Sequence, residues 1–268
     1  SDTYCEVRIA KSSGKCGSQL NFSVELDTLY FIGRGKMYNY QNWWSYSSSN
    51  YPPWYYYHDV IKTVVIQDGV SSIGEYAFVD FKVLQNITIP DSVTTIGQSA
   101  FQYCSSLQNI TIPSSIITIV NNLFFECKSL LTITIPDSII SIDNFAFYRC
   151  ISLQIITIPN SVISIGESAF AYCSSLQNIT IPESVSSIGG GAFSNCGMLD
   201  NFTYLGKTNP TDQYYIFGSS KLEAVFVLEN YINDTFYNLR IAKSLGKCGP
   251  ELNFSIESGT LFFRGQGP

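Results

Sequence analysis

The chain has 268 residues, of which 45% are apolar and only 13% are charged, with a net charge of −6. This apolar content is too high for a disordered chain, and the length suffices for one large domain. The acidic balance excludes nucleic acid as a partner, because binding to phosphates requires clustered Lys and Arg. No apolar run reaches the roughly 18 residues that insertion into a membrane requires.

The N-terminal segment recurs near the end of the chain. Arg8–Gly35 aligns without gaps to Arg240–Gly267, and 19 of 28 positions are identical. Two short apolar runs around a turn predict a β-hairpin in each copy. Each hairpin is expected to cap one end of an open stack of strands, whose edges would otherwise promote aggregation. Cys5 and Cys16 are the candidate disulfide pair of the first copy.

Between the first hairpin and the central region lies a segment rich in aromatic residues, Tyr38–His58. One interpretation is that its rings plug the open end of the first coil. The alternative is binding, because exposed Trp and Tyr are favoured as interface anchors and can also stack on sugars. Trp43 and Trp44 are the binding candidates. His58 is the only histidine, and nothing around it indicates a catalytic triad.

The central region repeats with a period of 23 residues. Phenylalanine marks one column of the repeat: Phe78, Phe101, Phe124, Phe147, Phe170 and Phe193. Each unit begins with an alternating Ile-Thr-Ile piece, which predicts a half-buried strand that a proline ends. The second part spaces Ala, Phe, Cys and Leu about three apart, which predicts a short α-helical or 3₁₀ turn. Such units bury their apolar faces only by stacking, so the sequence predicts an α/β repeat solenoid.

Two further columns follow from this stacking. A cysteine recurs once per unit and is interpreted as a small buried apolar side chain. The Cα atoms of cysteines in successive units would nevertheless lie within disulfide range. These residues are Cys104, Cys127, Cys150, Cys173 and Cys196. Threonines alternate with the buried isoleucines and should face solvent on the strands, where they are candidate ligand-binding residues. They are Thr88, Thr111, Thr134, Thr157 and Thr180. A generic β-propensity ladder without a ligand is the competing interpretation.

Seven asparagines lie in Asn-x-Ser/Thr sequons and are candidate glycosylation sites. They are Asn21, Asn86, Asn109, Asn178, Asn201, Asn233 and Asn253. Four of them neighbour the threonine column, so glycans at these positions would block the strand surface. The sequence contains no Cys-x-x-Cys motif or Cys/His cluster. We therefore expect no metal, no cofactor and no enzymatic activity.

In these motifs the chain resembles the BspA-like family of leucine-rich-repeat surface proteins. The resemblance lies in the Ile-Thr-Ile-Pro-Asp-Ser-Val-x-x-Ile-Gly-x-x-Ala-Phe-x-x-Cys-x-x-Leu unit, the Cys-Gly-x-x-Leu hairpin and Pro53-Trp54-Tyr55. It implies a right-handed leucine-rich-repeat horseshoe, with the strand surface on its concave side, and it implies that Trp54 occupies the capping position ahead of the first coil. It also implies a cell-surface or secreted adhesin that binds host matrix proteins, host cells or other microbes.

The resulting hypothesis divides the chain into three parts. Residues 1–61 form the N-terminal hairpin cap with its aromatic loop, 62–228 the solenoid, and 229–268 a C-terminal hairpin module. The expected function is non-enzymatic binding of an extracellular protein through the solenoid face and the Trp43/Trp44 loop. Two alternatives stay open, a carbohydrate-binding module and a structural spacer of a longer surface protein.

Overall fold

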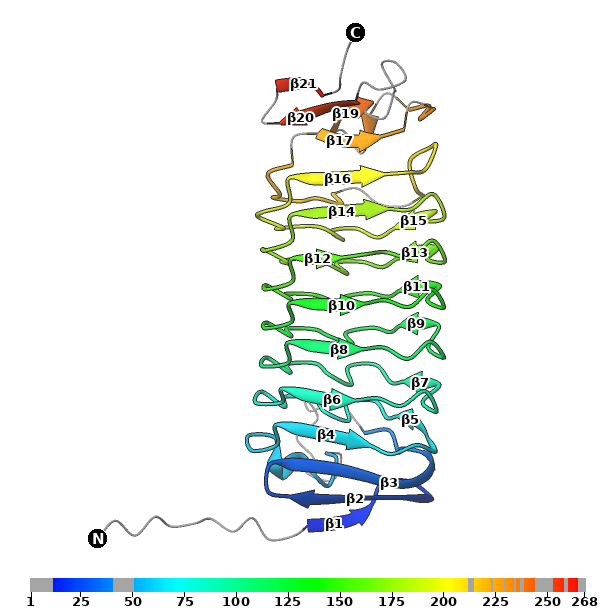
Figure 1. Cartoon of the computed structure of the whole chain (residues 1–268), viewed down its shortest axis with the longest axis vertical. Helices are drawn as coiled ribbons and strands as arrows, with labels where there is room; N and C mark the ends of the chain where they lie inside the picture. The colour runs from blue at the N-terminus through cyan, green and yellow to red at the C-terminus, as the bar shows by residue number, and fades with distance from the viewer. Residues whose placement is uncertain are drawn as a thin grey trace, which may run out of the picture.

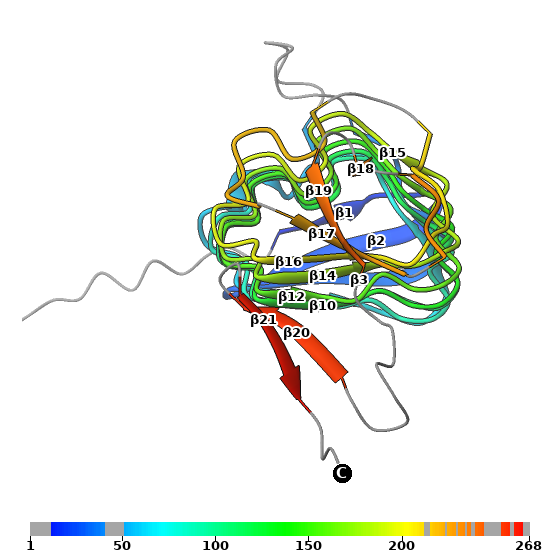
Figure 2. The ribbon, with the colours of Figure 1, turned by 90° about the horizontal axis from the view of Figure 1, so that it is seen from above.

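The protein is a β-solenoid, which confirms the predicted stack of repeats. The computed structural model describes residues 12–40, 51–211, 215–222, 224–228, 230–233, 235–236, 239–243, 253–257 and 260–264. Figure 1 shows the coils piled into an upright column, one above another in chain order. Seen from above, successive coils follow nearly the same outline (Figure 2). Each coil therefore places equivalent residues in a row along the column.

One side of the column, the first face, carries one strand from every coil. These strands are β4 (Thr63–Ile66), β6 (Asn86–Thr88), β8 (Asn109–Thr111), β10 (Thr132–Thr134), β12 (Ile155–Ile156), β14 (Asn178–Ile181), β16 (Asn201–Tyr204) and β17 (Ala224–Val227). Neighbouring strands pair in parallel from β4 to β6 and from β8 to β17, and Ile110 lies opposite Ile133. Because side chains alternate along a strand, the isoleucines point into the core and the threonines point out. The expected strand register is confirmed.

A second set of short strands, which forms the second face, was not predicted. It comprises β5 (Val70–Ile73), β7 (Thr95–Ile96), β9 (Thr118–Ile119), β11 (Ser141–Ile142), β13 (Ser164–Ile165) and β15 (Ser187–Ile188). β5 pairs in parallel with β7, and β9 to β15 pair in parallel with one another, with Ile142 opposite Ile119 and Ile165. The second face lies across the coil from the first, as Figure 2 shows for β15 and β14.

The predicted helical turn is instead a run of hydrogen-bonded turns. In the part of the chain that the structure describes, the one helical segment is the 3₁₀ turn at Tyr55–Tyr57. The Phe81 N–H donates to the Phe78 carbonyl, 3.3 Å away, as in a 3₁₀ turn. The Phe78 N–H instead donates to the Ala100 carbonyl of the next coil at 2.9 Å. Alternate N–H groups thus link coils, which prevents a continuous helix.

Aromatic rings and thiols fill the core in rows. The six phenylalanines of the repeat are buried and stack on one another, with Phe147 and Phe170 centroids 5.2 Å apart. The five cysteines of the repeat are buried free thiols, which confirms their interpretation as packing residues. Each thiol donates to a phenylalanine carbonyl of the preceding coil, as Cys150 does to Phe124 at 3.2 Å. Burial raises the pKa of Cys150 well above its usual value.

The N-terminal hairpin covers the start of the stack as predicted. Strands β1 (Ser12–Lys15), β2 (Gln19–Glu25) and β3 (Thr28–Lys36) pair antiparallel in sequence order. β3 then pairs in parallel with β4, which places Leu29 opposite Val64. The edge of the first coil is therefore hydrogen-bonded to the hairpin rather than open.

Trp54 closes the core beneath this hairpin, as expected. Its side chain is fully buried, and the indole Nε1–H donates to the Ala77 carbonyl at 2.8 Å. Its ring lies edge-on to Phe22 and Phe31 of the hairpin, with centroids 5.2 and 4.8 Å away. One tryptophan thus joins the hairpin to the first coil.

The C-terminal copy is arranged differently from the simple cap that was predicted. β19 (Leu239–Lys243), at the start of this copy, pairs in parallel with β17 and antiparallel with β18 (Thr235–Phe236). β20 (Asn253–Glu257) and β21 (Thr260–Arg264) form a separate hairpin. Its register, with Phe254 opposite Phe263, matches that of Phe22 and Phe31. The edge of β17 is thus covered by β19. The division into three parts stays a prediction.

Candidate functional site

The candidate binding surface is the outward side of the first face. We call the row Thr88, Thr111, Thr134, Thr157 and Thr180 the threonine face. All five side chains are exposed, because each alternates with an isoleucine that points into the core. Parallel pairing in register places Thr134 beside Thr111. The structure therefore brings together residues that lie 23 positions apart in the sequence.

A neighbouring row on the same face is also uncharged. It contains Asn86, Asn109, Thr132, Ile155 and Asn178, all exposed. Hydrogen bonds run between rungs, since the Thr132 hydroxyl donates to Asn109 Oδ1 at 3.0 Å. A hollow of about 240 Å³ is lined by Thr157, Asn178 and Thr180, among others. The face is therefore an uncharged, largely polar surface that includes this hollow, and it suits a large partner better than an enclosed small molecule.

The aromatic candidates fall into two groups. Trp43 and Trp44 lie outside the described residues, so their binding role stays a prediction. His58 follows the 3₁₀ turn Tyr55–Tyr57, and its ring stacks on Tyr55 with centroids 4.5 Å apart. Its Nε2 lies 2.5 Å from an Asp59 carboxylate oxygen. This packing accounts for the single histidine.

The candidate modification sites are mostly exposed. Asn21 on β2 is exposed, as are Asn86, Asn109, Asn178 and Asn201 on the first face. Asn233 is half-buried and accepts a hydrogen bond from the Asn209 backbone at 3.2 Å, and Asn253 begins β20. Their glycosylation stays a prediction. So does the Cys5–Cys16 disulfide, because Cys5 lies outside the described residues and Cys16 is buried.

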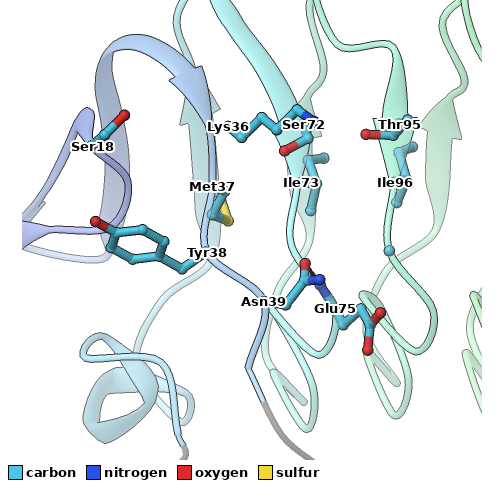
Figure 3. Close-up of a pocket in the computed structure, with 11 residues that line it drawn as sticks. Ser18, Lys36, Met37, Tyr38, Asn39, Ser72, Ile73, Glu75, Thr95 and Ile96 are labelled. Carbon is cyan, nitrogen blue, oxygen red and sulfur yellow. Dashed lines mark hydrogen bonds between the residues drawn. The ribbon is translucent and has the colours of Figure 1, made fainter.

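A cavity that the sequence did not indicate lies where the hairpin meets the first two coils. Its volume is about 490 Å³ (Figure 3). The hairpin side contributes Ser18, Lys36 and Tyr38, and the coils contribute Glu75 and Thr95. The Asn39 Oδ1 accepts the Glu75 N–H at 3.2 Å and ties the two parts together. Residues so far apart in the sequence carry no shared motif, so sequence reasoning had no signal for this cavity.

Among the residues that the structure describes, no three His, Cys, Asp or Glu side chains are grouped to hold a metal ion. In the same residues, no helix is long and apolar enough to cross a membrane.

Burial raises the pKa of the repeat cysteines, and it raises the pKa of Cys196 to about 12. These side chains are therefore neutral thiols at physiological pH.

The repeat is shared with known proteins. The family described as "BspA type Leucine rich repeat region" matches residues 52–141 and 118–242 in six copies. None of the curated proteins matches the sequence significantly.

The chain also resembles solved structures of low sequence identity. A leucine-rich repeat protein from Bacteroides ovatus is 21% identical, with 85% of this chain and 67% of that chain covered and a TM-score of 0.47. The T. pallidum leucine-rich repeat protein is 22% identical, with 80% and 83% covered and a TM-score of 0.43. A leucine-rich cell surface protein from Faecalibacterium prausnitzii is 21% identical, with 80% and 78% covered and a TM-score of 0.41.

Proposed function

The chain belongs to the BspA-type leucine-rich-repeat family, and from this premise we propose that it is an extracellular adhesin that binds a host or microbial protein through the threonine face. Its role is non-enzymatic, and its site of action is the cell surface or the surrounding medium. The Trp43/Trp44 loop supplies additional anchors. Repeat proteins of this kind present long regular surfaces, which suits recognition of large partners.

The observation that carries the proposal is the uninterrupted row of exposed, uncharged threonines. Five of them follow one another on adjacent coils, together with a parallel row that carries amides, one hydroxyl and the exposed Ile155. Such a surface offers many hydrogen-bonding groups but little charge and no deep pocket, so a single copy is expected to bind with modest affinity. Display of many copies on one cell would raise the avidity without any new contact.

The test is binding of the purified chain to immobilised fibronectin and other matrix proteins. Thr134→Lys with Thr157→Lys places two long cationic side chains in the middle of the threonine face. We expect this double variant to weaken binding at least tenfold, because both lysines obstruct the contact and introduce unpaired charge. Biolayer interferometry of wild type and variant measures the difference.

A matched control makes the same chemical change on the other side. Thr95→Lys with Thr118→Lys adds the same charge to exposed or half-buried threonines of the second face. Its affinity should stay within about twofold of wild type. Unchanged binding by the first-face variant, or no binding to any matrix protein, would contradict the proposal.

A further inference from the structure

The second face carries an exposed apolar stripe. Ile117, Ile140 and Ile163 are 58%, 45% and 50% exposed and occupy equivalent positions on three successive coils. They are held in register, because the Ile140 N–H donates to the Ile117 carbonyl and the Ile163 N–H to the Ile140 carbonyl, each at 2.8 Å. Thr94 and Ser186 hold the same position in the flanking coils. An exposed patch of this kind, bordered by polar residues, is typical of an interaction site.

Carboxylates follow this stripe along the same coils, since Asp143 comes three residues after Ile140 and Glu167 four residues after Ile163. Asp143 and Glu167 line a cavity of about 460 Å³ together with Asn121, Asn144 and other residues, and no Lys or Arg lines it. Asp143 accepts a hydrogen bond from the Ser141 hydroxyl at 3.0 Å. Among the described residues, neither Asp143 nor Glu167 has a cationic partner, whereas Glu183 pairs with Lys207. The coils that carry the stripe thus also carry negative charge that the described part of the chain does not neutralise.

The charge of the surrounding coils has the same sign. Between Lys82 and Lys207 the sequence contains seven acidic and two basic residues, so this stretch carries −5 of the net −6. Both basic residues, Lys128 and Arg149, form ion pairs with Glu126. A second copy of this chain would bring like charges together at the stripe. The complementary partner is therefore cationic as well as apolar.

The spacing of the stripe selects the conformation of the partner. Adjacent rungs are about 4.8 Å apart, so the outer isoleucines are separated by about 10 Å along the column. An α-helix that lies along the column repeats an apolar side chain about every 5.4 Å, and two turns differ from two rungs by about 1 Å. Along an extended strand, side chains on one side repeat about every 6.8 Å. Two such repeats exceed the distance between the outer isoleucines by about 4 Å. The helix fits the row and the strand does not.

We propose that Ile117, Ile140 and Ile163, with Asp143 and Glu167, form a docking surface for a cationic amphipathic helix. Its apolar side chains pack on the isoleucines, and its Lys or Arg side chains reach the two carboxylates. This surface is independent of the threonine face and of the ligand proposed for it.

The experiment uses a fluorescein-labelled peptide of about 14 residues, built of leucine and lysine with the leucines on one helical face. Fluorescence anisotropy of this peptide should show saturable binding to the wild-type chain. Asp143→Asn with Glu167→Gln should weaken binding about tenfold, since it removes two exposed ion pairs. Ile140→Ser with Ile163→Ser should also weaken it at least tenfold, because it removes the apolar contact.

The controls separate a site from general attraction to an acidic protein. Asp68→Asn with Asp200→Asn changes the net charge by the same amount at exposed positions elsewhere, and should leave binding within about twofold. A leucine–glutamate peptide of the same pattern should not bind. Equal loss in both charge variants, binding of the glutamate peptide, or no saturable binding would overturn the proposal. So would dimerisation of the chain through Ile140. The threonine-face variant Thr134→Lys with Thr157→Lys should bind the peptide normally, so this test and that of the proposed function fail separately.

Discussion

Raising the pH from 8 to 10 is expected to lower the free energy of unfolding by about 7 kcal/mol through the five repeat thiols alone, which are buried in the core. Burial raises the pKa of these thiols above the value of 9.0 that an ordinary cysteine has, and that of Cys104 well above it. Above pH 9 the unfolded chain loses protons that the folded chain keeps. The stabilisation is thus complete below pH 9 and declines as the pH rises toward the folded-state values.

Each of the five thiols contributes roughly 1.4 kcal/mol between these two pH values. Urea unfolding, followed by circular dichroism at several pH values, measures the decline. In Cys150→Ala the decline should be smaller by about 1.4 kcal/mol, whatever the effect of the substitution at pH 8. A free energy of unfolding that stays constant between pH 8 and 10 would show that these cysteines are not buried in the folded protein.

Replacing Trp54 by alanine is expected to lower the free energy of unfolding by about 5 kcal/mol. The substitution removes the largest fully buried side chain and leaves a cavity between the hairpin and the first coil. It also removes the donor to the Ala77 carbonyl, which then stays buried without its partner. Because coils contact only their neighbours, the loss should begin at the N-terminal end of the column.

Urea unfolding at pH 7 measures this effect. One further variant separates the contribution of the hydrogen bond from that of the ring, and another serves as a control at an exposed position. Trp54→Phe keeps an aromatic ring but lacks the N–H, so a smaller loss of about 2 kcal/mol is expected. Tyr56→Ala changes a side chain of the same 3₁₀ turn that is 79% exposed, and should cost less than about 0.5 kcal/mol. Equal effects for Trp54→Ala and Tyr56→Ala would mean that Trp54 does not join the hairpin to the solenoid.

The first-face strands were predictable because their pattern is local and repeated. The alternation of apolar and polar residues around Ile110 and Ile133 predicts a strand at each place. The period of 23 residues predicts that these two strands pair with each other. The second-face strands were missed because two residues, such as Thr118 and Ile119, are too few to show alternation. Their pairing arises from stacking between coils, which propensity does not record.

The turn that follows the second strand was misassigned for a different reason. Spacing of about three between apolar residues is the same for a helix and for a series of turns that bury one side. The structure resolves the ambiguity through bonds between coils, such as Phe78 to Ala100. Non-glycine residues with positive φ, among them Tyr103 at 65° and Arg149 at 57°, also interrupt a helix here. Nothing in the identity of these residues indicates that conformation.

Of the two candidate surfaces, one could be predicted from the sequence and the other could not. The threonine face could be predicted, since each Thr directly follows an Ile that points toward the core. The stripe of Ile117, Ile140 and Ile163 could not, because the sequence Ile116-Ile117 does not show which of the two isoleucines points outward. Which isoleucine points outward depends on where the second-face strand β9 begins.

The central claim is that equivalent residues of successive repeats form one straight row at constant spacing. Pulsed electron paramagnetic resonance tests it with one spin label at Thr88→Cys and the other at Thr157→Cys, Thr180→Cys or Thr203→Cys, with Cys5 and Cys248 replaced by serine. The separations should be about 14, 19 and 24 Å, rising by one rung for each repeat. Separations that do not increase in equal steps would contradict the stacked column and the binding surfaces derived from it.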